Sequence, residues 1–119
     1  MVAALVVRVA AGLVFVIFGI GKFTSHASEV DSFRTYGLPS PDAFVYAIGV
    51  IEIVGGALLI AGVVTRLVAL ILAGDMVGAI VVSGIGQGEP ISLTLAPALL
   101  LAMAYLVWVG AGRHPPRRA

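Results

Sequence analysis

Four stretches of this chain are each apolar for about the length of a membrane-spanning helix. An α-helix needs about 20 mostly apolar residues to cross the hydrocarbon core of a bilayer. The stretches run roughly over residues 2–23, 43–64, 67–84 and 91–111. Since only 11% of the residues are charged, against about 25% in soluble domains, the sequence predicts an all-α membrane protein. We expect one transmembrane domain over residues 1–119, folded as an antiparallel bundle of four transmembrane helices.

The connections between these stretches differ in length. Thr65 and Arg66 form a very short link between the second and third stretches, which predicts an antiparallel hairpin. A glycine-rich turn, residues 84–90, follows the third stretch. The first loop, residues 24–43, is the one sizeable polar segment of the sequence. Within it, residues 28–36 could form a short amphipathic helix that lies on the membrane surface as a lid, with an unstructured loop as the alternative.

The placement of lysine and arginine predicts the orientation in the membrane. Arg8, Arg66 and the three arginines of the C-terminal tail fall on one side, whereas Lys22 and Arg34 fall on the other. Because cytoplasmic segments carry the excess of these residues, we expect both termini in the cytoplasm. The protein is thus expected to be a multi-pass protein of the cytoplasmic (cell) membrane. Membrane lipid is an expected partner, and nucleic acid is not, because the sequence has no basic stripe interleaved with aromatic residues.

Two acidic residues, Glu52 and Asp75, lie in the middle of apolar stretches. A lone carboxylate at the bilayer centre costs at least ~2.5–3.5 kcal/mol, so it is expected to pair, to take up a proton or to line a wet cavity. Arg8 could reach inward to either acid. One interpretation is a polar pocket that holds a head group or passes a proton, and the other is a structural ion pair between Arg8 and Glu52. Lys22, at the end of the first stretch, either snorkels to the interface or joins a ligand site.

Glycines recur at helix-packing positions in three of the stretches. In lipid, small residues let helices approach closely, so we expect these glycines to tighten the bundle: Gly12, Gly19, Gly49, Gly55, Gly56, Gly62, Gly74 and Gly78. Cysteine is absent, which excludes disulfides and thiolate metal sites in this sequence. His26 and His114 fall in the outer loop and the tail, too far apart to ligate a haem together. We therefore expect no metal and no intrinsic cofactor.

The ordered set of these residues resembles the DoxX family of small four-span membrane proteins. The first stretch carries the family pattern R-x3-G-x2-F-x3-G-x2-K-F from Arg8 to Phe23, and the second carries E-x2-GG-x2-L-x2-G-x2-TR from Glu52 to Arg66. The loop adds Phe33 and Gly37-Leu38-Pro39, and the similarity continues to Gly112-Arg113. Asp75 departs from the family pattern, which is apolar there.

The resemblance implies a four-helix bundle and an association with redox chemistry. The family takes its name from a subunit of a thiosulfate:quinone oxidoreductase, and some eukaryotic relatives act as chaperone-like assembly proteins. Our leading hypothesis is a redox-associated membrane subunit, possessing no redox centre of its own, that binds a quinone or similar lipid-like molecule near Arg8, Glu52, Asp75 and Lys22. Its partners would be membrane or redox proteins, and the protein could also form a homo-oligomer. The alternatives are a non-catalytic assembly scaffold and a small carrier of a lipophile.

Overall fold

The computed structural model describes residues 2–35, 37, 40–85 and 90–110, and every element in this part of the chain is helical. The first half contains two long helices, α1 (Val2–Thr24) and α3 (Pro41–Ala61), separated by the short helix α2 (His26–Thr35). The second half contains α4 (Thr65–Ala79), its π-helical continuation η1 (Ile80–Ile85) and α5 (Pro90–Val109). Part of the predicted glycine-rich turn, the arginines of the tail, His114 and Tyr36 lie outside the described residues.

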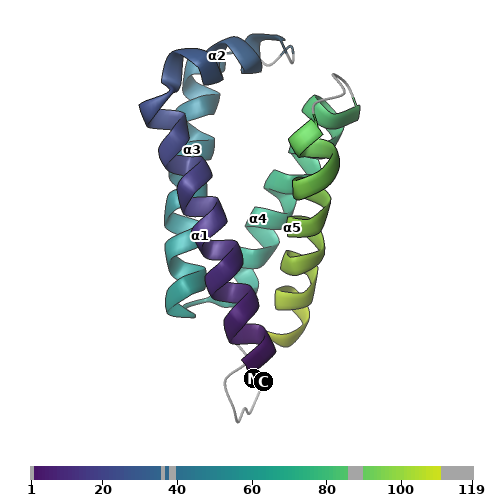
Figure 1. Ribbon diagram of the computed structural model, residues 1–119. Coiled ribbons are helices and arrows are strands. Elements are labelled where there is room, and N and C mark those ends of the chain that lie inside the picture. Colours follow the sequence, from purple (N-terminus) through teal and green to yellow (C-terminus); the bar gives the residue numbers. More distant parts are fainter. Residues whose placement is uncertain (1, 36, 38–39, 86–89, 111–119) are drawn as a thin grey trace.

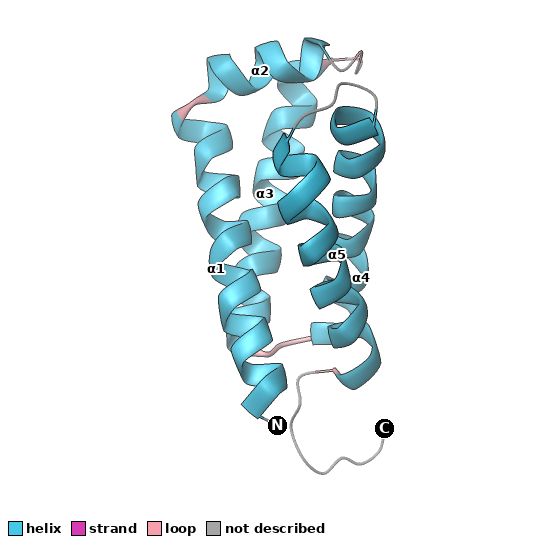
Figure 2. Cartoon of the chain, turned by 45° about the vertical axis from the view of Figure 1, so that its right-hand side comes forward, coloured by secondary structure: helices cyan, strands magenta, loops and turns pink. Residues whose placement is uncertain are grey.

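The long helices form two antiparallel pairs, α1 with α3 and α4 with α5 (Figure 1). The pairs touch each other less extensively, through α3 against α4 and α1 against α5. The start of α1 and the end of α5 lie at one end of the molecule, and α2 lies across the other end. Figure 2 shows the same arrangement from a second side. The prediction of an all-helical fold built from long apolar helices is confirmed.

The predicted hairpin between the second and third apolar stretches has its turn slightly earlier than expected. Gly62 ends α3 at φ 75° and donates its N–H to the carbonyls of Leu58 and Leu59. This left-handed conformation at a helix end favours glycine, which has no Cβ to clash. Thr65 therefore begins α4, and Arg66 lies in its first turn rather than in the link. The Arg66 side chain donates to the carbonyls of Val107 and Trp108, at the end of α5.

Glycines allow the backbones of α1 and α3 to touch. A Cβ built on Gly12 would lie 2.6 Å from the carbonyl oxygen of Gly56, and one on Gly19 would lie 2.7 Å from that of Gly49. Neither distance leaves room for a methyl group, so the two helices can meet at this spacing only with glycine at these positions. The prediction that glycines tighten the bundle is confirmed for this pair of helices.

The same prediction is wrong for Gly74 and Gly78 of α4. A Cβ on either glycine would meet no atom within 4 Å. The buried face of α4 instead carries larger side chains, among them Val68, Leu72 and Met76. The glycines fall on the opposite side of the helix, because a residue two positions from Leu72 is turned by about 200° at 100° per residue. Gly74 and Gly78 therefore do not tighten the packing of helices within this chain.

The apolar lengths of the helices fit a membrane protein. Among the described residues, three segments are long and apolar enough to span a bilayer, namely Val2–Thr24, Asp42–Ala61 and Thr65–Val82. Thr94–Val109 of α5 is a shorter apolar segment. Large apolar side chains cover the outside of the bundle, with Leu101 73% exposed and Trp108 82% exposed. Such an apolar exterior is stable in lipid but not in water.

The polar loop contains the predicted short helix, which begins two residues earlier than expected. Helix α2 covers His26–Thr35 and packs on α3. Val30 is buried and Phe33 is half-buried, as expected for the apolar face of an amphipathic helix. The unstructured alternative is therefore wrong. The helix lies across the end of the α1–α3 pair (Figure 1), and its Glu29 side chain approaches Lys22 of α1.

Candidate functional site

The centre of the candidate site is an ion pair between α1 and α3. The Nζ atom of Lys22 lies 3.1 Å from Oε1 of Glu52 and donates a hydrogen bond to it. The side chains are only 12% and 3% exposed, respectively. Transfer of a single charge into an apolar interior is strongly unfavourable, so the two charges depend on each other for neutralisation. Lys22 thus has a partner deep in the bundle, beyond the snorkelling position that is typical of a terminal lysine.

The predicted ion pair between Arg8 and Glu52 is wrong. Arg8 is buried, with only 6% of its surface exposed. Its Nη1 atom donates to the carbonyl oxygens of Leu59 and Ile60, at 3.1 and 3.3 Å. These carbonyls lie at the C-terminal end of α3, where backbone acceptors lack partners within the helix. Arg8 is therefore a cap for α3 and lies apart from the acidic residues.

Helix register explains why Lys22, and not Arg8, reaches Glu52. The contacts of Gly12 with Gly56 and of Gly19 with Gly49 set an antiparallel register in which Arg8 lies level with residue 60 and Glu52 with residue 16. Arg8 and Glu52 are then about 12 Å apart along the axis, at ~1.5 Å per residue.

Side-chain direction adds to this difference. Side chains on a helix lean toward its N-terminus. Lys22 therefore leans down α1 toward Glu52, Glu52 leans up α3 toward Lys22, and Arg8 leans away from both.

Asp75 of α4 joins the pair from the other side. Its carboxyl group lies within hydrogen-bonding reach of the Glu52 carboxyl, where the two groups also repel each other when both are charged. Its Oδ2 atom is buried and has no hydrogen-bond partner among the residues that the structure describes. One cation, Lys22, therefore serves two adjoining acids, and the buried Asp75 Oδ2 atom receives no hydrogen bond from a donor group of the described residues. Three of the four predicted site residues come together here.

A second carboxylate, Glu29 of α2, approaches the same lysine from the polar end. Its Oε1 atom lies 3.9 Å from Lys22 Nζ, and its side chain is 35% exposed. The sequence reasoning missed this residue. The sequence carried no signal for it, because its contact with Lys22 depends on how α2 folds back over the end of α1.

His26 braces the same end of the bundle. Its Nε2 atom lies 2.7 Å from Asp42 Oδ1, and its ring stacks on that of Tyr46 with centroids 4.1 Å apart. Its Nδ1 atom lies 3.2 Å from the carbonyl oxygen of Lys22. These contacts join the start of α2 to the start of α3, directly beside the lysine. They hold α2 over the site.

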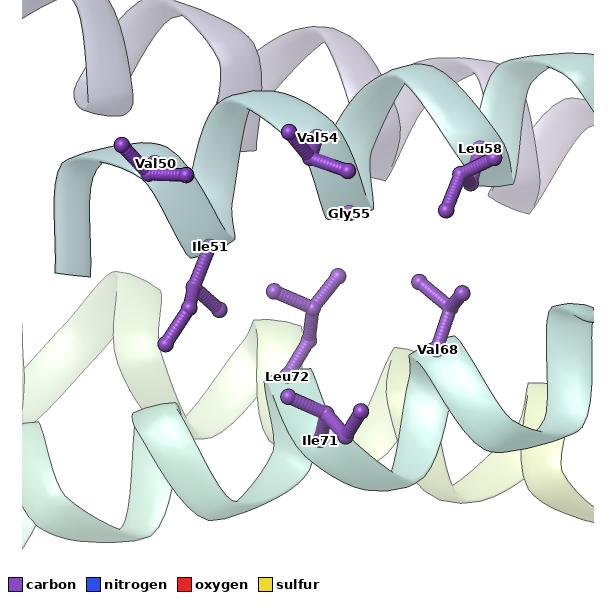
Figure 3. Close-up of a pocket in the computed structure, with 8 residues that line it drawn as sticks. All are labelled: Val50, Ile51, Val54, Gly55, Leu58, Val68, Ile71 and Leu72. Atoms are coloured by element: carbon purple, nitrogen blue, oxygen red, sulfur yellow. The ribbon is translucent and has the colours of Figure 1, made fainter. Parts of the chain in front are cut away.

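An apolar groove runs between α3 and α4 (Figure 3). Its volume is about 230 Å³. Only apolar residues line it: Val50, Ile51, Val54, Gly55, Leu58, Val68, Ile71 and Leu72. Ile51 immediately precedes Glu52, and Ile71 and Leu72 lie one helical turn before Asp75. The groove therefore ends within one turn of the acidic pair.

A family model for DoxX matches residues 3–85 of the chain. The chain belongs to the DoxX family. This DoxX protein is 35% identical over 80 residues to a Bacillus subtilis (strain 168) protein named "Putative oxidoreductase CatD"; the match covers 67% of the chain and 58% of the relative. It is 34% identical over 122 aligned positions to "Uncharacterized membrane protein Rv3486" of Mycobacterium tuberculosis (strain ATCC 25618 / H37Rv), covering 90% of the chain and 74% of the relative. No solved structure matches it significantly.

The family match covers α1 to α4 and therefore every side chain of the site. Together with its long apolar helices, it makes the DoxX protein a membrane protein. Chemically, the site combines a buried cation, two adjoining acids and an apolar groove. Such a combination suits a ligand with a small polar head and a long apolar body, because each part finds surroundings of its own polarity.

Proposed function

We propose that this DoxX protein is an integral membrane subunit of a redox-associated complex and binds a quinone or a similar lipid-like molecule. The head group would lie at Lys22, Glu52 and Asp75, and the apolar tail would lie in the groove between α3 and α4. The observation that carries the proposal is the buried Oδ2 atom of Asp75, which receives no hydrogen bond from a donor of the described residues, near an apolar groove. A buried acceptor without a partner is unfavourable by about 1–3 kcal/mol, which a ligand hydroxyl would recover.

The polar groups match both redox states of a quinone. A reduced ring presents hydroxyl groups, which donate to carboxylate oxygens such as Asp75 Oδ2. An oxidised ring presents carbonyl oxygens, which accept from an ammonium group such as Lys22 Nζ or from a protonated carboxyl. Because Glu52 and Asp75 lie within hydrogen-bonding reach of each other, one proton shared between them would supply that donor.

The groove supports the apolar part of the ligand. At about 230 Å³, it has room for the first units of an isoprenoid or acyl chain, while the remainder would extend into the bilayer. Its walls are aliphatic, and burial of apolar surface contributes about 25 cal/mol per Å². Figure 3 shows Ile51 and Leu58 of α3 directed toward Leu72 and Val68 of α4 across it.

The redox setting and the membrane arrangement are further parts of the proposal. The CatD relative is named as an oxidoreductase, which favours a redox partner over a purely structural one. Electrons would come from that partner protein, with this chain supplying the binding site. We place all four long helices across the cytoplasmic membrane, with both termini in the cytoplasm and α2 on the opposite surface.

Binding of a short-chain quinone to the protein in lipid nanodiscs tests the proposal. Decyl-ubiquinone and a decyl-menaquinone analogue should each raise the midpoint of thermal unfolding of the wild type. Asp75→Leu should weaken binding about 10- to 100-fold, which corresponds to a lost hydrogen bond of about 1–3 kcal/mol, and Asp75→Asn should bind within about threefold of the wild type, since it keeps an acceptor oxygen.

The tail has its own matched pair of variants. Val54, 51% exposed in the groove, becomes Phe in V54F, which should fill the groove and weaken binding. Ile17, 63% exposed on α1, becomes Phe in I17F as the control and should bind as the wild type does. Absence of any saturable binding by the wild type, or equal weakening by V54F and I17F, would reject this site.

A scaffold that docks other transmembrane helices is the second candidate function. The open glycine face of α4, at Gly74 and Gly78, favours it, because small residues permit close helix contact in lipid. Bulky substitution at Gly78 with no loss of quinone binding, but with loss of a copurified membrane protein, would support the scaffold.

A further inference from the structure

The charged residues of the site form a continuous series that starts at the polar end of the bundle and ends in its interior. Glu29 lies 3.9 Å from Lys22, Lys22 lies 3.1 Å from Glu52, and Glu52 adjoins Asp75. We propose that Glu29, Lys22, Glu52 and Asp75 form a one-sided proton path between the membrane surface at α2 and the buried acidic pair. The path deepens the proposed function, because reduction and oxidation of a quinone require protons, but its geometry does not depend on a quinone.

Burial increases steadily along the path. The side chain of Glu29 is 35% exposed, that of Lys22 is 12% exposed and that of Glu52 is 3% exposed. Glu29 can therefore exchange protons with water, whereas Glu52 can do so only through a neighbour. Lys22 is that neighbour, since its single Nζ atom contacts a carboxylate on each side.

A proton transfer through Lys22 conserves charge at every step. The ammonium group gives a proton from Nζ to a carboxylate oxygen of Glu52, which leaves a neutral amine and a neutral carboxyl. The amine lone pair then takes a proton from the Glu29 carboxyl, which had taken it from a hydronium ion at the surface and released a water molecule. Lys22 is again an ammonium group, Glu29 is again a carboxylate, and one proton has moved to the Glu52–Asp75 pair. The flexible stem of lysine permits the small movement that the 3.9 Å separation requires.

Few other charged groups lie near this series. His26 contacts the backbone carbonyl of Lys22 and points its Nε2 atom at Asp42, so its ring faces the surface end. Arg34 and Asp31 of α2 pair with each other in an exposed position. Within the described part of α5, no side chain is charged. Asp75 is the one acid of α4, and Arg66 is at its other end.

The interior end of the path is closed toward the opposite surface. Below Glu52, the backbones of α1 and α3 touch at Gly12 and Gly56. Phe15 and Leu59 are fully buried beside this contact. Arg8 lies beyond them and is engaged with carbonyl oxygens of α3. The described residues between Glu52 and Arg8 on these two helices carry no titratable side chain, so the path has no continuation along α1 and α3 toward the opposite surface.

Hydrogen–deuterium exchange of the buried carboxyl tests the path without any quinone. The wild type in lipid nanodiscs is mixed rapidly into D2O, and the C=O band of the protonated carboxyl is followed by infrared spectroscopy. The band is assigned by its loss in Asp75→Asn or Glu52→Gln. Glu29→Gln should slow the exchange roughly tenfold or more, since removal of a positioned acid–base group commonly changes a rate by 10²–10⁴. Lys22→Met should slow it at least as much.

A matched control comes from the same helix. Asp31 is 79% exposed and pairs with Arg34, so Asp31→Asn removes an acid of α2 without touching the path and should exchange as the wild type does. If Lys22→Met does not fold, Glu29→Gln alone decides the outcome. Unchanged exchange in Glu29→Gln, or equal slowing by Asp31→Asn, would overturn the path, as would a wild type with no protonated carboxyl band. Slowed exchange in a protein that binds no quinone would support the path and reject the proposed function.

Discussion

The clearest test of the site is whether Glu52 is energetically coupled to Lys22 and not to Arg8. At the observed 3.1 Å between Nζ and Oε1, the Coulomb attraction is about 5 kcal/mol for an effective dielectric constant of ~20. Desolvation offsets much of this attraction, but loss of one partner leaves the other charge buried. The variant Lys22→Met should therefore destabilise the fold by about 3–5 kcal/mol.

The reverse variant should have a smaller effect. Glu52→Gln leaves Lys22 with a second carboxylate, Glu29, at 3.9 Å, and the lysine stem can extend toward the interface. We expect a loss of about 1.5–3 kcal/mol, the typical value for one hydrogen bond to a charged group. Because Lys22→Met/Glu52→Gln has no stranded charge, it should recover much of the loss, which gives a coupling energy of about 2–4 kcal/mol.

Arg8 supplies the matched control cycle. Arg8→Met should destabilise α3 by about 1–3 kcal/mol, since two carbonyl acceptors lose their donor. Its effect should add to that of Glu52→Gln within about 0.5 kcal/mol, as for separate sites. Unfolding free energies are measured by SDS titration of the purified protein in mixed micelles, followed by far-UV circular dichroism. The assigned pairing would be refuted by a coupling energy below about 0.5 kcal/mol between Lys22 and Glu52. A coupling energy between Arg8 and Glu52 that exceeds the one between Lys22 and Glu52 would refute it as well.

Two further predictions concern packing and topology. Gly56→Ala should destabilise the fold by about 1–3 kcal/mol through overpacking, because its Cβ would lie 2.5 Å from the carbonyl oxygen of Gly12. The control Gly74→Ala, whose Cβ meets no atom within 4 Å, should be neutral or stabilising by up to about 1 kcal/mol. SDS titration gives both values, and equal losses would contradict the close contact of α1 with α3. Single cysteines at Ser28 and Val2 should react with an impermeant maleimide from opposite sides of the membrane in spheroplasts and inverted vesicles, with Ser28 outside, and labelling of both from one side would contradict the proposed membrane arrangement.

The sequence alone determined the class of the protein and the residues worth examining. Hydropathy acts residue by residue, so apolar runs of membrane length predict spanning helices without knowledge of their neighbours. The same local argument makes Glu52 and Asp75 conspicuous, because any buried acid in lipid needs a partner wherever it points. The short helix of the first loop was predicted from its polar and apolar spacing and its glycine and proline boundaries, and it is present as α2.

Only the tertiary structure decided which residues meet. The partner of Glu52 depends on the antiparallel register of α1 and α3, on their rotation about their axes and on the direction in which side chains lean. Contacts between glycines of α1 and α3 set the register to within a residue. Each contact joins two helices, so the sequence of one helix does not predict it. The same holds for Glu29, which reaches Lys22 only because α2 folds back, and for the groove, whose walls come from two helices. Hydropathy is a property of each residue in lipid, whereas pairing is a property of two helices in contact.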